Sequence, residues 1–243
     1  MLYFVGQIRG IMTTISAKVQ AVNERIRAAC AAAGRPPETV RLLAVSKTWP
    51  AEAVRAAALA GQRAFGENYA QEGVAKVEAL RGLGLEWHFI GPLQSNKTRL
   101  VAEHFDWAHS VDRLKIAERL SEQRPAALRP LQVCLQVKLS DEESKGGARP
   151  DELTALALAV SRLPRLRLRG LMTLPEATAD LALLRQRFGE LRRLRDRLNA
   201  EGIAMDTLSM GMSDDLEVAI AEGSTLVRVG RAIFGDRRKE LAA

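Results

Sequence analysis

The sequence of 243 residues has few cysteines, few histidines and no long apolar run. Its two cysteines, Cys30 and Cys134, belong to no C-x-x-C pair or Cys/His cluster, which argues against a zinc site and a disulfide framework. No apolar stretch approaches the roughly 18 residues needed to span a membrane, and the first residues show no signal-peptide pattern. We expect a cytoplasmic protein with no bound metal and no membrane association.

Aromatic residues are also scarce, at 5%, although the formal net charge is +7. Only eight of the 36 basic residues are lysines, and many of the arginines lie at 162–170 and 185–197. The second segment has the amphipathic pattern of a helix with arginines on its outer face. Nucleic-acid binding would require aromatic side chains among these charges, and only Phe188 is present. A nucleic acid is therefore not the expected partner.

Apolar strand patterns alternate with amphipathic helix patterns along the chain. A first helix is expected at 14–33 and ends at the stop signal Gly34 to Pro37. The expected strands are at 40–47, 63–68, 86–91, 106–112, 131–139, 166–174, 206–211 and 225–235. The helical patterns between them are at 51–60, 70–81, 95–104, 113–124, 151–162, 180–200 and 214–222. This order implies a parallel sheet.

Eight β/α repeats predict a single closed (β/α)8 barrel, a TIM barrel, with an extra helix in front. A doubly wound open sheet is the alternative, although eight strands are more typical of a closed barrel. We assign residues 14–238 to the barrel domain, 1–13 to an N-terminal extension and 239–243 to a C-terminal tail. The extension precedes a second methionine, Met12, and is interpreted as an upstream start or as non-native residues.

The functional side chains of such a barrel lie at the carboxyl ends of its strands. Lys47 ends the first expected strand, where a lysine beside an apolar run is unusual. It is either a salt-bridged or surface lysine, or a nucleophile that forms a Schiff base with an aldehyde. In the second role, partial desolvation would lower the pKa of the amine, so that more of it is the neutral nucleophile. The same rim carries Glu67 and Asn68 after the second strand.

A second group of polar residues follows the last two strands. Ser213 or Asp214 could cap the helix at 214–222 without any ligand. A serine hydroxyl, a glycine and the N–H groups of a helix start also suit a phosphate group, and Gly230 and Arg231 would supply the neighbouring half of such a site. Together with the lysine after the first strand, these residues predict a ligand with both an aldehyde and a phosphate.

Three further features bear on the interior and the mouth of the barrel. Arg228 interrupts the apolar eighth strand and points either outward to a helical carboxylate or inward, where its charge could keep the nitrogen of a pyridine ring unprotonated. One of Trp87 and His88 must face the barrel interior, and a hydrogen-bonded core histidine is expected. The loop at 140–147 is interpreted as a solvated loop, with a lid over the barrel mouth as the alternative.

Several sequence blocks in a fixed order now form a recognisable pattern. Between about Ile15 and Asp236 the chain resembles the pyridoxal phosphate homeostasis protein family, whose barrel is that of the alanine racemase N-terminal domain (fold type III). The blocks are AVSKT, FGENYAQE, EWHFIGPLQSNK, SVDR, ESKGG, LRGLMTLP, LSMGMSDDLEVAIAEGSTLVRVG and AIFG. Their common order is far more specific than any single block.

The resemblance implies that Lys47 holds pyridoxal 5′-phosphate (PLP) as a Schiff base. Arg228 would face the pyridine nitrogen, and the phosphate would lie at Ser213 and at the backbone of the last strand end. The expected PLP-binding residues are Lys47, Asn68, Ser213, Arg228, Gly230 and Arg231. Many family members have a small hydroxyl residue in place of Arg231, so its side chain either adds charge or swings away. Trp49 replaces the lysine that is common in SKTKP.

Two functions fit such a site, and they belong to different classes. One is a non-catalytic protein that holds PLP for intracellular homeostasis and delivery, with apo-enzymes as recipients. The other is a small PLP-dependent amino-acid racemase, which needs acid/base groups on both faces of the substrate. The tyrosine that supplies the second face in racemases belongs to a C-terminal β-domain, which we do not expect in this protein, and Tyr69 is expected to pack at a helix start. We favour the carrier, expect a monomer, and keep a Schiff-base aldolase without cofactor as a third hypothesis.

Overall fold

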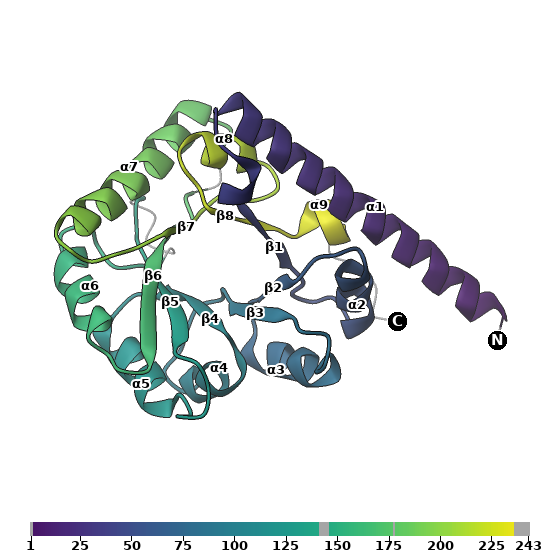
Figure 1. Ribbon diagram of the computed structural model, residues 1–243, viewed down its shortest axis with the longest axis horizontal. Helices are drawn as coiled ribbons and strands as arrows, with labels where there is room; N and C mark the ends of the chain where they lie inside the picture. The colour runs from purple at the N-terminus through teal and green to yellow at the C-terminus, as the bar shows by residue number, and fades with distance from the viewer. Residues whose placement is uncertain (1, 141–145, 177, 236–243) are drawn as a thin grey trace.

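The computed structural model describes residues 2–140, 146–176 and 178–235, which form a closed barrel of eight parallel strands (Figure 1). Every strand pairs with its neighbours in sequence, and the last strand closes the ring against the first, with Arg228 opposite Leu43. The strands are β1 (Arg41–Val45), β2 (Ala64–Glu67), β3 (Glu86–Phe89), β4 (Trp107–Val111), β5 (Leu131–Gln136), β6 (Leu166–Met172), β7 (Thr207–Ser209) and β8 (Leu226–Val229). The predicted TIM barrel is confirmed, and the open-sheet alternative is wrong.

Helices surround the ring of strands, as the alternation of patterns predicted. They are α1 (Leu2–Ala32), α2 (Ala51–Leu59), α3 (Ala70–Ala79), α4 (Thr98–His104), α5 (Leu114–Gln123), α6 (Leu153–Ser161), α7 (Leu181–Ala200), α8 (Leu216–Ala221) and α9 (Arg231–Phe234), with a short 3-10 helix, η1 (Pro37–Thr39). None of the helices in the described ranges is long and apolar enough to cross a membrane.

Two element boundaries differ most from the sequence prediction. Helix α1 begins at Leu2 rather than near residue 14, since no proline or turn signal interrupts this stretch. The eighth strand ends at Val229, and the apolar residues that follow form the single turn α9 instead of more strand. Because α9 is so short, α1 covers the adjoining part of the ring and packs against α2, α8 and α9 (Figure 1).

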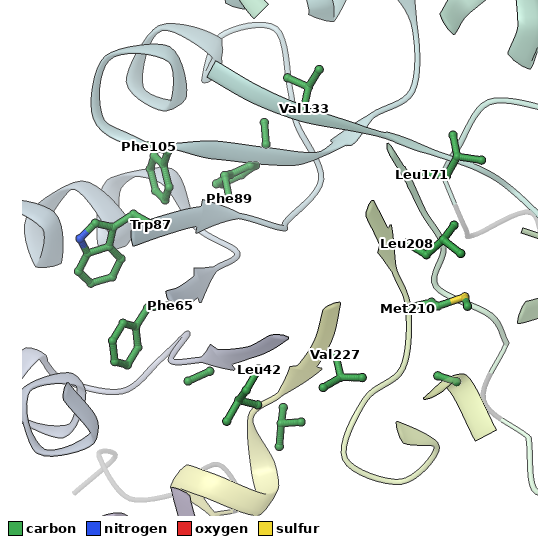
Figure 2. Packing of buried hydrophobic residues seen from close by; sticks show 14 of the residues in the cluster. Leu42, Phe65, Trp87, Phe89, Phe105, Val133, Leu171, Leu208, Met210 and Val227 are labelled. Carbon is green, nitrogen blue, oxygen red and sulfur yellow. The ribbon is translucent and has the colours of Figure 1, made fainter. Parts of the chain in front are cut away.

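The strands bury one row of side chains under the helices and the other inside the barrel. Figure 2 shows the outer row, in which Leu42, Phe65, Trp87 and Val227 lie on the helix side of the strands. Phe65 is fully buried, and burial of such a side chain contributes about 1.5–3 kcal/mol. This row follows from the two-residue period of the strand sequences.

The interior of the barrel contains two small apolar clusters and a group of buried polar residues. The apolar clusters include Leu43 with Leu226, and Trp107 with Cys134 and Met172. The buried polar side chains are those of His88, His109, Ser209 and Arg228. Polar groups at this depth must be hydrogen-bonded to be tolerated.

Candidate functional site

The turn after β1 places Lys47 at the rim formed by the carboxyl ends of the strands. β1 ends at Val45, two residues before the predicted end, and Lys47 is half-buried in the turn. The next residue, Thr48, has φ +67°, and it is the one non-glycine residue in the described part of the chain with a positive φ. A β-branched side chain in this region is strained by about 1–3 kcal/mol. Strain of this kind is common where a fold fixes a functional residue.

A buried ion pair holds the residue on the N-terminal side of Lys47. Lys76 Nζ of α3 donates to the carbonyl oxygen of Ser46 at 2.7 Å and to Glu67 Oε1 at 2.8 Å. Ser46 Oγ also donates to Glu67 Oε1, at 2.6 Å. Burial raises the pKa of Glu67, while the charge of Lys76 and these hydrogen bonds lower it and so partly offset the effect. The pair therefore fastens the end of β1 to β2 and α3.

The same lysine reaches the residue on the C-terminal side of Lys47 through a second carboxylate. Lys76 Nζ donates to Glu72 Oε1 at 2.7 Å, and the Thr48 N–H donates to that oxygen at 2.6 Å. The contact to Thr48 stabilises its left-handed backbone. Lys47 thus lies between two residues whose backbones are both fixed by the Lys76 network.

Asn68 lies at the end of β2 with an acceptor that needs a partner. Its Oδ1 is buried and accepts no hydrogen bond from the described residues. Gly91, after β3, lies so close that an added Cβ would be 2.1 Å from the Asn68 carbonyl oxygen. The absence of a side chain at Gly91 lets the two loops touch and holds Asn68 at the rim. A buried, unpaired amide oxygen suits a ligand that donates a hydrogen bond.

The predicted phosphate residues meet at the ends of β7 and β8. Ser213 Oγ accepts a hydrogen bond from the Ala232 N–H at 3.4 Å, which joins the β7 loop to α9. A Cβ at Gly230 would be 3.1 Å from the Val45 carbonyl oxygen, so the backbone there passes close to the end of β1. Arg25 of α1 donates to the Ser213 carbonyl oxygen at 3.1 Å and steadies this loop from outside.

Neither Ser213 nor Asp214 caps helix α8, so the interpretation of one of them as the helix cap is wrong. Asp215 is the N-cap residue, and its Oδ1 accepts from the Met212 N–H at 2.5 Å. Asp214 instead forms an ion pair with the Arg231 side chain, and both groups are largely exposed. The Arg231 guanidinium is therefore engaged by a carboxylate, while the Ser213 hydroxyl is not used by α8.

Arg228 points into the barrel rather than outward. Its guanidinium is buried and donates to the Ser209 carbonyl oxygen at 2.6 Å, to Ser209 Oγ at 2.8 Å and to the Thr173 carbonyl oxygen at 2.9 Å. Burial lowers its pKa to about 10, so it is still charged at neutral pH. The inward alternative is confirmed, and a fixed cation stands among the strand ends.

Comparison with known proteins shows which family this chain belongs to. Residues 18–238 match the family model of the alanine racemase N-terminal domain. The chain is 62% identical to the pyridoxal phosphate homeostasis protein of Pseudomonas aeruginosa over 93% of this chain and 97% of that protein. It is 55% identical to the protein of that name from Escherichia coli over 93% and 98%. The chain belongs to the pyridoxal phosphate homeostasis protein family.

Solved structures place the family barrel among known folds. PipY from Synechococcus elongatus PCC7942, solved with PLP bound, has 40% identity and a TM-score of 0.81, and the match covers 91% of this chain and 100% of PipY. Alanine racemase from Corynebacterium glutamicum has 16% identity and a TM-score of 0.70, over 95% of this chain and 64% of the racemase. The racemase likeness concerns the fold alone.

Some predictions for this family member are refined, and others fall outside the described residues. His88 is the inward residue of β3 and is hydrogen-bonded, as expected. Tyr69 precedes α3 but is 53% exposed, so the prediction that it packs is wrong. Residues 141–145 of the loop considered as a lid, and the tail at 239–243, lie outside the described residues. No three His, Cys, Asp or Glu side chains in the described ranges gather as a metal site.

Sequence reasoning missed two groups of residues. Lys76 lies in an amphipathic helical pattern, in which a lysine is expected on the solvent side, so its burial was not predicted. His109 had no visible partner, because its contact with Ser209 joins residues 100 apart in the chain. The alternation of β4 does place His109 on the same face as Trp107, and this was the available signal.

Proposed function

We propose that this protein binds PLP through Lys47 and acts in intracellular PLP homeostasis and delivery without catalysing a reaction of its own. One observation supports the proposal: Lys47, Asn68, Ser213 and Arg228 lie at or just after the carboxyl ends of strands of one closed barrel, in a chain that belongs to this family. PLP supplies an aldehyde that forms a Schiff base with a primary amine.

The residues present fit such a ligand. Lys47 Nζ would attack the aldehyde carbon, with the aldehyde oxygen leaving as water. The Asn68 Oδ1 atom, which accepts no bond from the described residues, would receive a hydrogen bond from the ligand. The Ser213 hydroxyl and the backbone at Gly230 and Arg231 would hold the phosphate, and the Arg231 side chain would stay with Asp214.

The charge of Arg228 favours a carrier over a racemase. A guanidinium beside the pyridine nitrogen keeps that nitrogen unprotonated and so weakens the ring as an electron sink. The racemase alternative also needs a second acid/base group, and Tyr69, the tyrosine near this rim, is exposed at 53%. These features support binding more than carbanion chemistry.

We further propose that the protein acts in the cytoplasm as a monomer. Cys30 and Cys134 are both buried free thiols, and burial raises the pKa of Cys134 to about 12. Unpaired thiols are typical of a reducing compartment. Sedimentation of the purified protein with and without PLP tests the monomer, and a dimer at micromolar concentration would contradict it.

Three assays on one sample test the carrier. PLP is titrated into ligand-free protein while the near-visible absorption band is followed. The loaded protein is then mixed with L-alanine and assayed for D-alanine, and mixed with the apo form of a PLP-dependent enzyme to measure recovered activity. We expect a band, no enantiomer exchange and recovery of the apo-enzyme. Sustained enantiomer exchange would establish the racemase, and a protein that stays colourless with PLP would favour the aldolase.

A further inference from the structure

A chain of buried hydrogen bonds runs from Arg228 into the barrel. Arg228 Nη1 donates to Ser209 Oγ at 2.8 Å, and Ser209 Oγ lies 2.9 Å from His109 Nδ1. Ser209 is fully buried, as is His109. The Ser209 hydroxyl is therefore the first link between the cation at the rim and the polar interior.

The chain continues through two histidines to a carboxylate. His109 Nε2 lies 2.9 Å from His88 Nδ1, and His88 Nε2 lies 2.6 Å from Glu86 Oε1. The His88 ring stacks on Trp107, with centroids 5.2 Å apart and an angle of 9° between the planes. Glu86 is the first residue of β3 and also accepts from Arg41 at 2.9 Å. The chain thus joins the rim where β8 ends to the opposite end of the barrel, where β3 begins.

The hydrogens of this chain have one consistent arrangement. Glu86 is an acceptor, so His88 donates from Nε2 and must accept at Nδ1 if it is neutral. His109 then donates from Nε2 and accepts at Nδ1 from the Ser209 hydroxyl. Ser209 Oγ in turn accepts from Arg228, which is always a donor. Every hydrogen bond therefore points from Arg228 toward Glu86.

Burial and charge support neutral histidines. Burial lowers the pKa of His88, opposed by its hydrogen bond to Glu86. Burial also lowers the pKa of His109 well below its usual value, as do the charges of Arg228 and Arg41. The groups facing the two rings are a cation at one end and a carboxylate with Arg41 at the other. A neutral pair between them keeps all donors and acceptors matched.

We infer that Ser209, His109, His88 and Glu86 are positioning residues for Arg228, and that their one-way hydrogen-bond chain couples the far end of the barrel to the cofactor rim. The Ser209 hydroxyl donates its proton to His109 and accepts from the Arg228 guanidinium, and this bond adds to those that Arg228 makes to the carbonyl oxygens of Ser209 and Thr173. This inference rests on the proposed function in one respect, namely that Arg228 faces the PLP ring.

The first test measures the histidine tautomers in ligand-free protein, so it is independent of PLP binding. The protein has three histidines, and ¹⁵N–¹H long-range correlation spectra at pH 8 assign the protonated nitrogen of each. We expect Nε2–H in both His88 and His109. His104 is the internal reference, because its Nδ1 lies 3.1 Å from the Leu100 carbonyl oxygen and should carry the proton. Nδ1–H in either His88 or His109 would overturn the one-way chain.

The second test asks whether the far end of the chain affects the cofactor. Glu86→Leu removes the terminal acceptor, and Ser209→Ala removes the first link without touching the far end. Asp206→Leu is the control, because Asp206 lies just before β7 at that end of the barrel and pairs with Arg169, outside the hydrogen-bond chain. We expect Glu86→Leu and Ser209→Ala to weaken PLP affinity about three- to tenfold and to shift the absorption band, as coupling through a packed network allows.

Different results of these tests would contradict different parts of the proposal. If the control alters PLP affinity and the band as much as Glu86→Leu does, the positioning role is wrong. If Ser209→Ala leaves the band and the affinity unchanged, the coupling to Arg228 is wrong even where the tautomers agree. If wild-type protein binds no PLP at all, the proposed function fails. The tautomer spectra would still show whether the hydrogen bonds point from Arg228 toward Glu86.

Discussion

Lys76 Nζ lies 2.7 Å from the carbonyl oxygen of Ser46, the residue before Lys47. The lysine is 6% exposed and its partner Glu67 is not exposed at all. A surface helix therefore turns a charged side chain inward to fasten the turn that carries the proposed PLP lysine.

Lys76→Met should destabilise the protein by about 3–5 kcal/mol, because it leaves the buried Glu67 carboxylate without its cation. Urea unfolding followed by circular dichroism measures the change. The double variant Lys76→Met with Glu67→Gln removes both charges and keeps an acceptor for Ser46, so it should recover most of the loss. A double variant as unstable as the single one would contradict this account of the pair.

Thr48→Gly should leave the stability unchanged or raise it by up to about 1 kcal/mol. Glycine relieves the left-handed strain at φ +67°, and this gain offsets the conformational entropy that glycine loses on folding. Thr154→Gly within α6 is the matched control, and it should cost about 0.3–0.5 kcal/mol, because glycine has a lower helix propensity than threonine. Equal losses in the two variants, measured by thermal and urea unfolding, would show that Thr48 carries no strain.

Glu86 gives a pH-dependent prediction. Burial raises its pKa, but the hydrogen bond from His88 and the charge of Arg41 outweigh it and lower the pKa from 4.5 to about 2. A carboxyl with a lowered folded-state pKa stabilises the fold above the unfolded pKa, and this stabilisation is lost as the pH falls from about 4.5 to about 2.

Glu86→Gln should therefore be less stable than wild type by about 1–3 kcal/mol at pH 6, and the difference should shrink at pH 3. Urea midpoints at the two pH values measure it. Glu118→Gln on the exposed side of α5 is the control and should show no such trend. A stability difference that grows toward pH 3 would contradict the prediction that ionised Glu86 stabilises the fold.

Asp214→Asn should strengthen PLP binding by a few fold while changing stability by less than about 1 kcal/mol, because exposed ion pairs contribute little. The change releases the Arg231 guanidinium, which could then turn to the phosphate. Asp196→Asn, which breaks an ion pair with Arg195 on α7, should leave PLP affinity unchanged. Weaker PLP binding by Asp214→Asn would mean that Asp214 itself supports the site.

Much of the fold could be read from the sequence because the barrel is built from local periodicity. The outward row of strand residues, such as Leu42 and Phe65, follows a period of two that needs no tertiary information. The end of β8 could not be read in this way, because residues 231–234 continue the apolar run yet turn into α9 after Gly230.

The direction of buried polar side chains was the harder part of the site. Both faces of β8 are buried, so the sequence left Arg228 with two possible directions, and only the closed ring brings Ser209 and Thr173 to it. The burial of Lys76 could not be predicted from the sequence for a related reason. A lysine in a helix normally lies in solvent, and its partners at Ser46 and Glu67 come from two strands 30 and 9 residues away.

Borohydride reduction fixes PLP on the lysine that holds it, and it therefore tests the proposed role of Lys47. The protein is incubated with PLP, reduced with borohydride and digested, and the peptides are analysed by mass spectrometry beside Lys47→Ala treated in the same way. We expect one modified peptide, with the phosphopyridoxyl group on Lys47, and no visible absorption band in the variant. Modification of a different lysine, or a band of wild-type intensity in Lys47→Ala, would contradict the account.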